Sequence, residues 1–251
     1  MLKKELAPGI IQYVFPPRKE TFHFGDSITA IIHENKAILI DTGFENEARQ
    51  VLEDLSAQGV TVDSVIISHF HDDHMYGLKL INNVPVYGSC NFQHTLDMWT
   101  DKEDRKYFTP SITIEKPTII EFGKHTLEIL PSPGHSLCTV LVKINGQFIH
   151  IADEIMYSND GQPLLPSIES RQDIKRQLES WNLLKDYQNF TIILGHGWAF
   201  DGKNLHEDLR NRMTYASAIL GAVGAITYEE AVKDCNFEFL HKNWFDHLAV
   251  E

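Results

Sequence analysis

The sequence feature that most constrains this chain is a cluster of potential metal ligands directly after an apolar segment, residues 62–67. Four side chains within six positions form the cluster: His69, His71, Asp73 and His74. Imidazole and carboxylate groups bind zinc, iron, manganese and similar divalent cations. The chain contains 13 histidines in 251 residues, so three of them within six positions would rarely coincide by chance. One ion cannot easily use all four side chains of so short a loop, and the motif therefore predicts two ions close together.

Apolar segments alternate with helical patterns along the chain. The predicted strands are 10–15, 28–33, 37–40, 62–67, 119–131 with a turn at 123–124, 139–144, 147–151 and 190–194. The predicted helices are 48–55, a stretch ending near 80, 174–184, 205–220 and a segment after 227. The polar segment 91–116 is predicted to be a helix plus an irregular excursion. This order describes two similar α/β halves.

Short-range signals mark several turns and helix starts. The Asn-Gly pair at 145–146 predicts a tight hairpin between two apolar runs. Ser170 with Asp173, and Thr227 with Glu230, have the spacing that caps the first turn of a helix.

The two halves follow each other without a Gly/Ser-rich or Pro-rich linker, so we expect a single domain over residues 1–251. A sandwich of two sheets with helices outside is the natural packing for such halves. Residues from about 203 to 251 are predicted to form a helical C-terminal tail.

The charge of the chain argues against nucleic acid and anionic lipid as partners. Lys and Arg number 22 and Asp and Glu 35, which gives a formal net charge of −13. A field of that sign repels phosphate backbones. No apolar run approaches the roughly 20 residues that span a bilayer. We therefore expect a small-molecule substrate, no nucleic acid and no membrane, and leave the oligomeric state open, with a homodimer as one option.

The N-terminal and cysteine patterns predict a cytoplasmic protein. Lys3 and Lys4 resemble the start of a signal peptide, but Glu5 and Pro8 break the apolar stretch that should follow. The three cysteines have no Cys-x-x-Cys spacing, so neither a disulfide framework nor a thiolate zinc site is expected.

The histidine motif resembles the signature His-x-His-x-Asp-His of the metallo-β-lactamase superfamily. Four further segments resemble motifs of that family in the same order: Asp41-Thr42-Gly43, Ser132-Pro133-Gly134-His135-Ser136, Ala152-Asp153 and Gly195-His196-Gly197. The likeness covers nearly the whole chain. It implies an α/β fold, a four-layer αβ/βα sandwich of two mixed sheets flanked by helices, with metal ions at one edge between the sheets.

The resemblance also implies the ligands of two divalent cations, with zinc as the first choice and iron or manganese as alternatives. Seven residues receive this role: His69, His71 and His135 at one ion, Asp73, His74 and His196 at the other, and Asp153 as a bridge. Asp41 would accept a hydrogen bond from a ligand or from the His69 loop.

Such a pair of cations lowers the pKa of bound water and polarises a substrate oxygen. The first hypothesis is therefore a metal-dependent hydrolase, in which a hydroxide bridging the ions attacks the carbonyl of a small ester, lactone or thioester. Asp73 and Asp153 are its predicted catalytic residues. The alternatives are a phosphodiesterase with the same site, a mononuclear iron oxidoreductase similar to persulfide dioxygenases, and a protein that binds a ligand without turnover.

Aromatic residues beside the motifs are candidates for the substrate pocket: Phe70, Tyr157 and Trp198. Lactonases of this family are expected to carry a tyrosine three residues after the bridging aspartate. Met156 stands there in this chain and Tyr157 follows it, which weakens the support for a lactone substrate.

Overall fold

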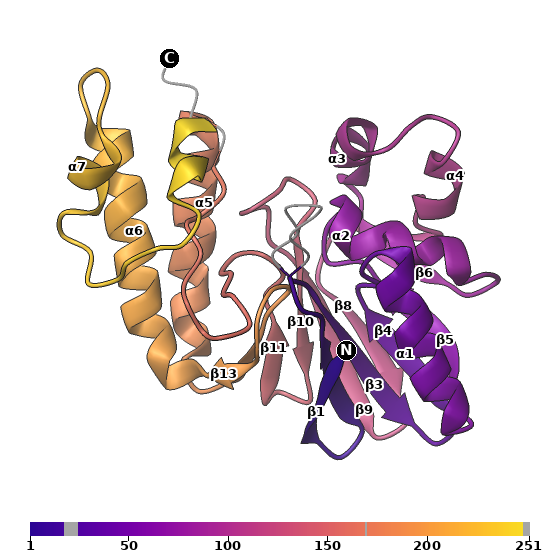
Figure 1. Ribbon diagram of the computed structural model, residues 1–251. Coiled ribbons are helices and arrows are strands. Elements are labelled where there is room, and N and C mark those ends of the chain that lie inside the picture. Colours follow the sequence, from indigo (N-terminus) through magenta and orange to yellow (C-terminus); the bar gives the residue numbers. More distant parts are fainter. Residues whose placement is uncertain (18–24, 169, 248–251) are drawn as a thin grey trace.

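The computed structural model describes residues 1–17, 25–168 and 170–247. Two β-sheets lie in the middle of the molecule, with helices on both outer flanks (Figure 1). The first sheet contains, in spatial order, β1 (Leu2–Ala7), β2 (Ile10–Val14), β3 (Ser27–His33), β4 (Lys36–Ile40), β5 (Thr61–Ile66), β6 (Val86–Ser89) and β7 (Ile112–Ile114). The second contains β13 (Phe200–Asp201), β12 (Thr191–Ile193), β11 (Phe148–His150), β10 (Val140–Ile144), β9 (His125–Pro131) and β8 (Thr118–Phe122).

Both sheets are mixed. In the first, β1 to β4 pair antiparallel and β4 to β7 pair parallel. In the second, β8 to β11 are antiparallel, β11 and β12 are parallel, and β13 returns antiparallel. The hairpin predicted at 145–146 joins β10 and β11, and both of its residues have positive φ, as tight hairpin turns require.

The helices of the first half are α1 (Glu45–Ala57), α2 (Asp72–Met75), the 3₁₀ helix η2 (Tyr76–Leu80), α3 (Phe92–Trp99) and α4 (Arg105–Phe108). Those of the second half are α5 (Arg171–Leu184), η3 (Lys185–Tyr187), η4 (Gly202–Asn204), α6 (Leu205–Gly221), α7 (Tyr228–Val232) and η5 (Lys242–His247). Both predicted caps are present, because Ser170 accepts a hydrogen bond from Asp173 N and Thr227 forms a capping box with Glu230.

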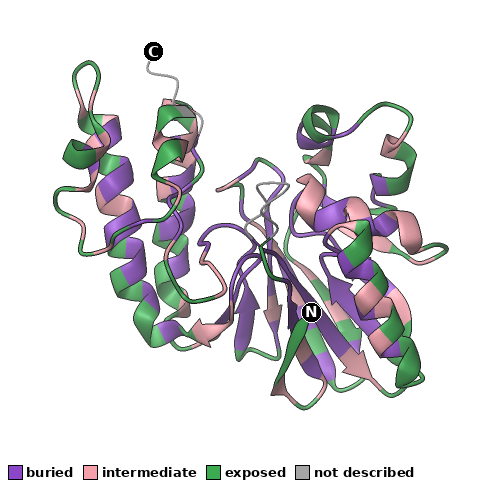
Figure 2. Cartoon of the chain, viewed as in Figure 1, coloured by how far each residue is buried: buried purple, intermediate pink, exposed green. Residues whose placement is uncertain are grey.

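Three apolar clusters fill the three interfaces of this four-layer sandwich, and Figure 2 shows the buried strands between half-exposed helices. Alternation along β4 explains how one strand serves two interfaces. Leu39 packs in the cluster under α1, whereas Ile38 and Ile40 pack in the cluster between the sheets. On the other side, Ile149 of β11 packs in the cluster that contains Trp181 of α5. The predicted αβ/βα sandwich is therefore confirmed.

Some elements differ from the sequence expectation. The edge strand β1 was not predicted, because its side chains are mostly exposed and carry no apolar run. The excursion at 91–116 contains α3, α4 and the edge strand β7. The helix expected after the histidine motif is a four-residue α-helix followed by a 3₁₀ turn. Among the described residues, no helix has the length and apolar character needed to cross a bilayer.

The sheets bring all five sequence motifs to one edge. Asp41 directly follows β4, and the histidine motif follows β5. In the second half the motifs follow β9, β11 and β12. Backbone hydrogen bonds join the two halves at this edge, from Ser27 N to Gly195 O at 2.7 Å and from Val140 N to Ser68 O at 2.8 Å. Motifs far apart in the sequence therefore meet in space.

Candidate metal centre

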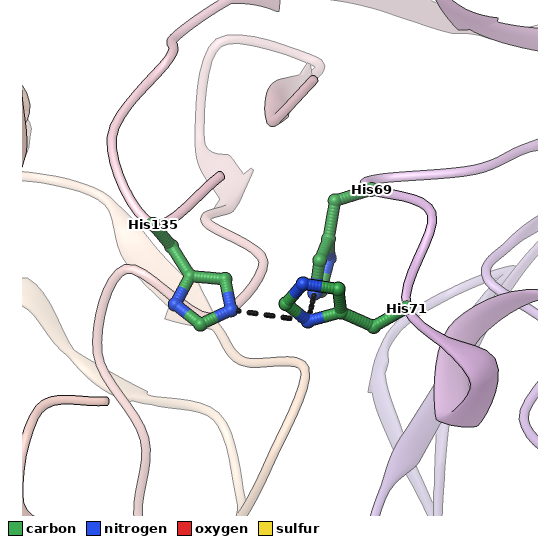
Figure 3. Close-up of side chains that lie close together, drawn as sticks. All are labelled: His69, His71 and His135. Atoms are coloured by element: carbon green, nitrogen blue, oxygen red, sulfur yellow. Dashed lines mark hydrogen bonds between the residues drawn. The ribbon is translucent and has the colours of Figure 1, made fainter. Parts of the chain in front are cut away.

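Three histidines from both halves point their ring nitrogens at one another (Figure 3). Nδ1 of His71 lies 3.0 Å from Nε2 of His69 and 3.3 Å from Nε2 of His135. His69 is fully buried, whereas His71 and His135 are partly exposed. Three imidazole nitrogens at this separation could bind one divalent cation.

Asp153 lies at the centre of the wider cluster. Its Oδ2 is 3.0 Å from Nε2 of His196, 3.3 Å from that of His74 and 3.6 Å from that of His69. The same oxygen lies 3.9 Å from Nε2 of His135. Asp153 thus lies close to imidazoles of both predicted ligand groups, which is the position that a bridging ligand requires.

A second group adjoins the first on the buried side. Asp73, His74 and His196 place ligand atoms within 4.8 Å of one another. Asp73 Oδ1 lies 3.6 Å from His74 Nε2, and its Oδ2 lies 3.4 Å from His196 Nε2. The structure therefore brings together all seven residues that the sequence motifs nominated.

Hydrogen bonds away from the cluster set the tautomers of its buried histidines. Asp41 Oδ2 accepts from Ser68 Oγ at 2.7 Å and pairs with His74 Nδ1 at 2.9 Å. Because the single Ser68 hydroxyl proton points to Asp41, His69 Nδ1 donates to Ser68 Oγ, 3.1 Å away. His196 Nδ1 donates to Gly25 O. In all three rings Nδ1 donates a hydrogen bond away from the cluster, so Nε2 is the atom that faces the cluster.

The electrostatics of the cluster separate its histidines into two kinds. Burial lowers the pKa of His69 and His71 well below the usual range, and the neighbouring imidazoles add to that effect. Burial also opposes protonation of His196, but Asp153 and Asp73 outweigh it and raise the pKa of His196 to about 9. The three carboxylates around His74 raise the pKa of that histidine in the same way, against the effect of burial.

The chemistry of the donor set fits divalent cations. Within the described part of the chain, Oδ1 of Asp153 is buried and has no hydrogen-bond partner. Buried polar atoms left in this way are costly unless a ligand satisfies them. Imidazole nitrogen and carboxylate oxygen are the donors that zinc, iron and manganese accept. The space is also tight, since a Cβ on Gly195 would lie 2.2 Å from Asp153 Oδ1.

Asp41 supports the centre without facing it, which gives a first prediction. Asp41 Oδ1 accepts from Ser68 N, and Oδ2 accepts from both Ser68 Oγ and His74 Nδ1. In Asp41→Asn one of these two acceptors becomes a donor, so at least one hydrogen bond that orients the ligand loop or His74 is lost. We expect divalent cation affinity to fall about 10- to 100-fold, the usual effect of removing a partner of a ligand. Competition with a chelator measures it, with Asp63→Asn as control, because Asp63 pairs with Lys36 on the surface. Unchanged affinity would make Asp41 a turn residue only.

A cavity of about 230 Å³ adjoins the partly exposed side of the cluster, where His71 and His135 form part of its lining. The aromatic residues nominated from the sequence do not line it. The prediction that Phe70 lines the pocket was wrong. Phe70 is fully buried and packs on Phe92, with ring centroids 5.5 Å apart. Side chains alternate along this segment, so Phe70 points away from its two histidine neighbours. Tyr157 donates its hydroxyl to Asp208 of α6, and the partly exposed Trp198 lies outside the lining.

Several residues of the site were missed from the sequence. Trp99 lies beside the cluster, with its ring centroid 4.8 Å from that of His71. Glu154 is buried and accepts from His135 N at 3.0 Å, and burial raises its pKa to about 7. Gln12 of β2 holds the loop around His196, because it donates to Gly197 O at 3.0 Å and accepts from Ala199 N at 2.9 Å. Only the position of Glu154, next to Asp153, was a signal in the sequence.

Comparison with known proteins identifies a family and curated relatives. A profile of the metallo-beta-lactamase superfamily matches residues 24–196. Hydroxyacylglutathione hydrolase of Pectobacterium carotovorum is 24% identical over 133 residues, which cover 51% of this chain and 46% of the relative. The hydroxyacylglutathione hydrolase of Hahella chejuensis is 29% identical over 107 residues, which cover 41% of this chain and 35% of the relative. The matches thus span less than half the length of either relative.

Solved structures resemble the fold over most of the chain. VMB-1 superimposes with a TM-score of 0.65 at 19% identity, over 86% of this chain and 97% of that structure. The DIM-1 metallo-β-lactamase has a TM-score of 0.64 at 16% identity, over 86% and 96% of the two chains. At this level of identity the likeness establishes the shared fold.

Proposed function

Since the chain belongs to the metallo-β-lactamase superfamily, we propose that it is a metal-dependent hydrolase whose cluster holds two divalent cations, with zinc as the first choice. The proposed substrate is a small molecule with a carboxylic ester or thioester bond. The observation that carries the proposal is the second ligand group, Asp73, His74 and His196, beside the first. A centre for one iron ion would need only one group of three, so the second group favours a pair of ions over the mononuclear oxidoreductase.

The residues of the chain would divide the work of the site as follows. His69, His71 and His135 would hold one cation and the second ligand group the other, with Asp153 between them. When bound, two cations lower the pKa of water and polarise a carbonyl oxygen. Asp73 would be the carboxylate that takes a proton from water, which is supported by its greater exposure, since its side chain is 14% exposed and that of Asp153 is 4% exposed. Ser68 and Asp41 would keep the histidine rings oriented throughout.

The choice of an acyl substrate rests on the relatives and on charge. The curated relatives are named hydroxyacylglutathione hydrolases, which supports a thioester or a similar acyl bond. The net charge of −13 disfavours a polyanionic substrate such as RNA. Tyr157 is engaged by Asp208 and is therefore not placed to assist a lactone carbonyl.

Metal removal tests this function directly. Treatment with a chelator followed by its removal should abolish hydrolysis of a panel of acetyl esters and thioesters, and added Zn²⁺ should restore it. The same treatment should lower Tm, because a cation that binds only the folded chain at 1,000 times its Kd stabilises it by about 4 kcal/mol. Hydrolysis that persists without metal, or no hydrolysis of any panel member by the fully loaded protein, would overturn the proposal.

A further inference from the structure

The cavity beside the cluster is built from both halves of the molecule. Helix α3 supplies one wall with Met98 and Trp99, and the loop after β9 supplies Leu137. The start of α5 supplies Asp173 and Arg176. Because His71 and His135 also line it, a group in this cavity lies next to the proposed cations.

The apolar wall is unusually exposed. The exposed fractions are 61% for Met98, 41% for Trp99 and 42% for Leu137. Single exposed apolar residues are common, but three gathered around one hollow next to a buried polar cluster indicate a surface that a ligand covers. A bound apolar group would remove this surface from water.

Asp173 and Arg176, two charged residues of the lining, neutralise each other within the protein. Arg176 Nη1 pairs with Asp173 Oδ1 at 2.9 Å, and Arg176 Nε donates to Gly134 O at 2.9 Å. Ser170 Oγ donates to the other Asp173 oxygen at 2.6 Å. An anionic group in the cavity would therefore have to compete with Asp173 for Arg176.

The volume limits what enters. A cavity of 230 Å³ exceeds the roughly 150 Å³ of a protein cavity known to hold benzene. It is smaller than the roughly 300–1,000 Å³ of typical pockets for drug-sized ligands. A six-carbon chain or a phenyl ring therefore fits inside it, whereas most of a tripeptide would lie outside it.

We propose that this cavity is the specificity pocket of the enzyme and selects substrates with an uncharged, apolar substituent of about six carbons beside the scissile bond. The inference rests on the proposed hydrolase function. It departs from the substrate in the name of the curated relatives, whose glutathione moiety is anionic.

Matched substrates test the preference. S-ethyl thioacetate is the reference, S-ethyl thiohexanoate and S-hexyl thioacetate extend it on either side of the bond, and each extended compound has an analogue with a terminal carboxylate. We expect one extended compound to gain about tenfold or more in kcat/KM over the reference, the scale of an added apolar group in a fitted pocket. Its carboxylate analogue should lose that gain.

Variants assign the effect to the pocket. Trp99→Ala should reduce the gain to less than threefold, and Met98→Ala, at a more exposed position, provides a second variant if the first folds poorly. Leu183→Ala on α5 is the control, because Leu183 is 61% exposed and lies outside the lining. Asp173→Asn frees Arg176 and should raise kcat/KM for the carboxylate analogue about tenfold.

A binding measurement separates this inference from the function on which it rests. Calorimetric titration with hexanamide and with its terminal carboxylate analogue needs no turnover. Binding of hexanamide alone, lost in Trp99→Ala, would support the pocket even if no thioester were cleaved. Hydrolysis of the reference with no gain for either extended compound, or equal turnover of the carboxylate analogues, would overturn the pocket and leave the hydrolase function intact.

Discussion

Asp153→Ala is expected to reduce the metal content of the protein and to lower kcat/KM by more than about 100-fold, beyond the usual effect of losing a partner of a ligand. The reason is the position of Asp153 Oδ2, within 3.9 Å of imidazole nitrogens from both ligand groups. Without that carboxylate, the negative charge that lies between the four histidine rings is lost. Elemental analysis of the purified variant, together with its kinetics, measures both effects.

The control for this variant is Asp160→Ala. Asp160 is exposed on the loop that follows the site, and it accepts a hydrogen bond only from a nearby serine among the contacts described for it. Its replacement should leave metal content and turnover unchanged. If Asp153→Ala retained two tightly held metal ions with near-normal turnover, the bridging role of Asp153 would be wrong.

Arg212→Met is expected to destabilise the fold by about 3–5 kcal/mol, the usual loss when one partner of a buried ion pair is removed. Arg212 of α6 is 1% exposed, and its Nε lies 2.6 Å from Asp208 Oδ1. Its other nitrogens donate to Leu164 O at 2.8 Å and Met156 O at 3.0 Å. The variant leaves the Asp208 carboxylate buried without its cation. Urea unfolding monitored by circular dichroism gives the free energy of unfolding.

Two further variants test this interpretation. Arg210→Met, two positions earlier on the same helix, replaces an exposed arginine whose nearest carboxylate lies 4.0 Å away, so it should change stability by less than about 0.5 kcal/mol. Adding Asp208→Leu to Arg212→Met removes the stranded carboxylate and should recover part of the loss. A loss below about 1 kcal/mol for Arg212→Met would show that the ion pair contributes little.

The resemblance of the motifs to the metallo-β-lactamase superfamily implied the ligands. His135 and His196 lie in the turns shortly after β9 and β12, and strands that end at one edge bring such residues together. The tight turns that carry them, with Pro-Gly and Gly-His-Gly, are local signals. The sequence therefore predicted the sandwich, and the resemblance predicted which residues the sandwich brings together.

The pocket was not predictable in the same way, because its walls are set by tertiary packing. Trp99 reaches the cluster because α3 folds back from a polar excursion with little periodic pattern. Tyr157 turns away because Asp208, 51 residues later, accepts its hydroxyl proton. Arg212 lies on a helix that buries several polar residues, and a hydropathy pattern does not distinguish such a buried polar face from an exposed one.

The most direct test of the proposed centre is an anomalous diffraction map of the protein crystallised with Zn²⁺. Two peaks per chain are expected, one within about 2.0–2.2 Å of nitrogens of His69, His71 and His135 and one at the same range from ligand atoms of Asp73, His74 and His196. A single peak, or two peaks that lie away from these side chains, would contradict the dinuclear centre.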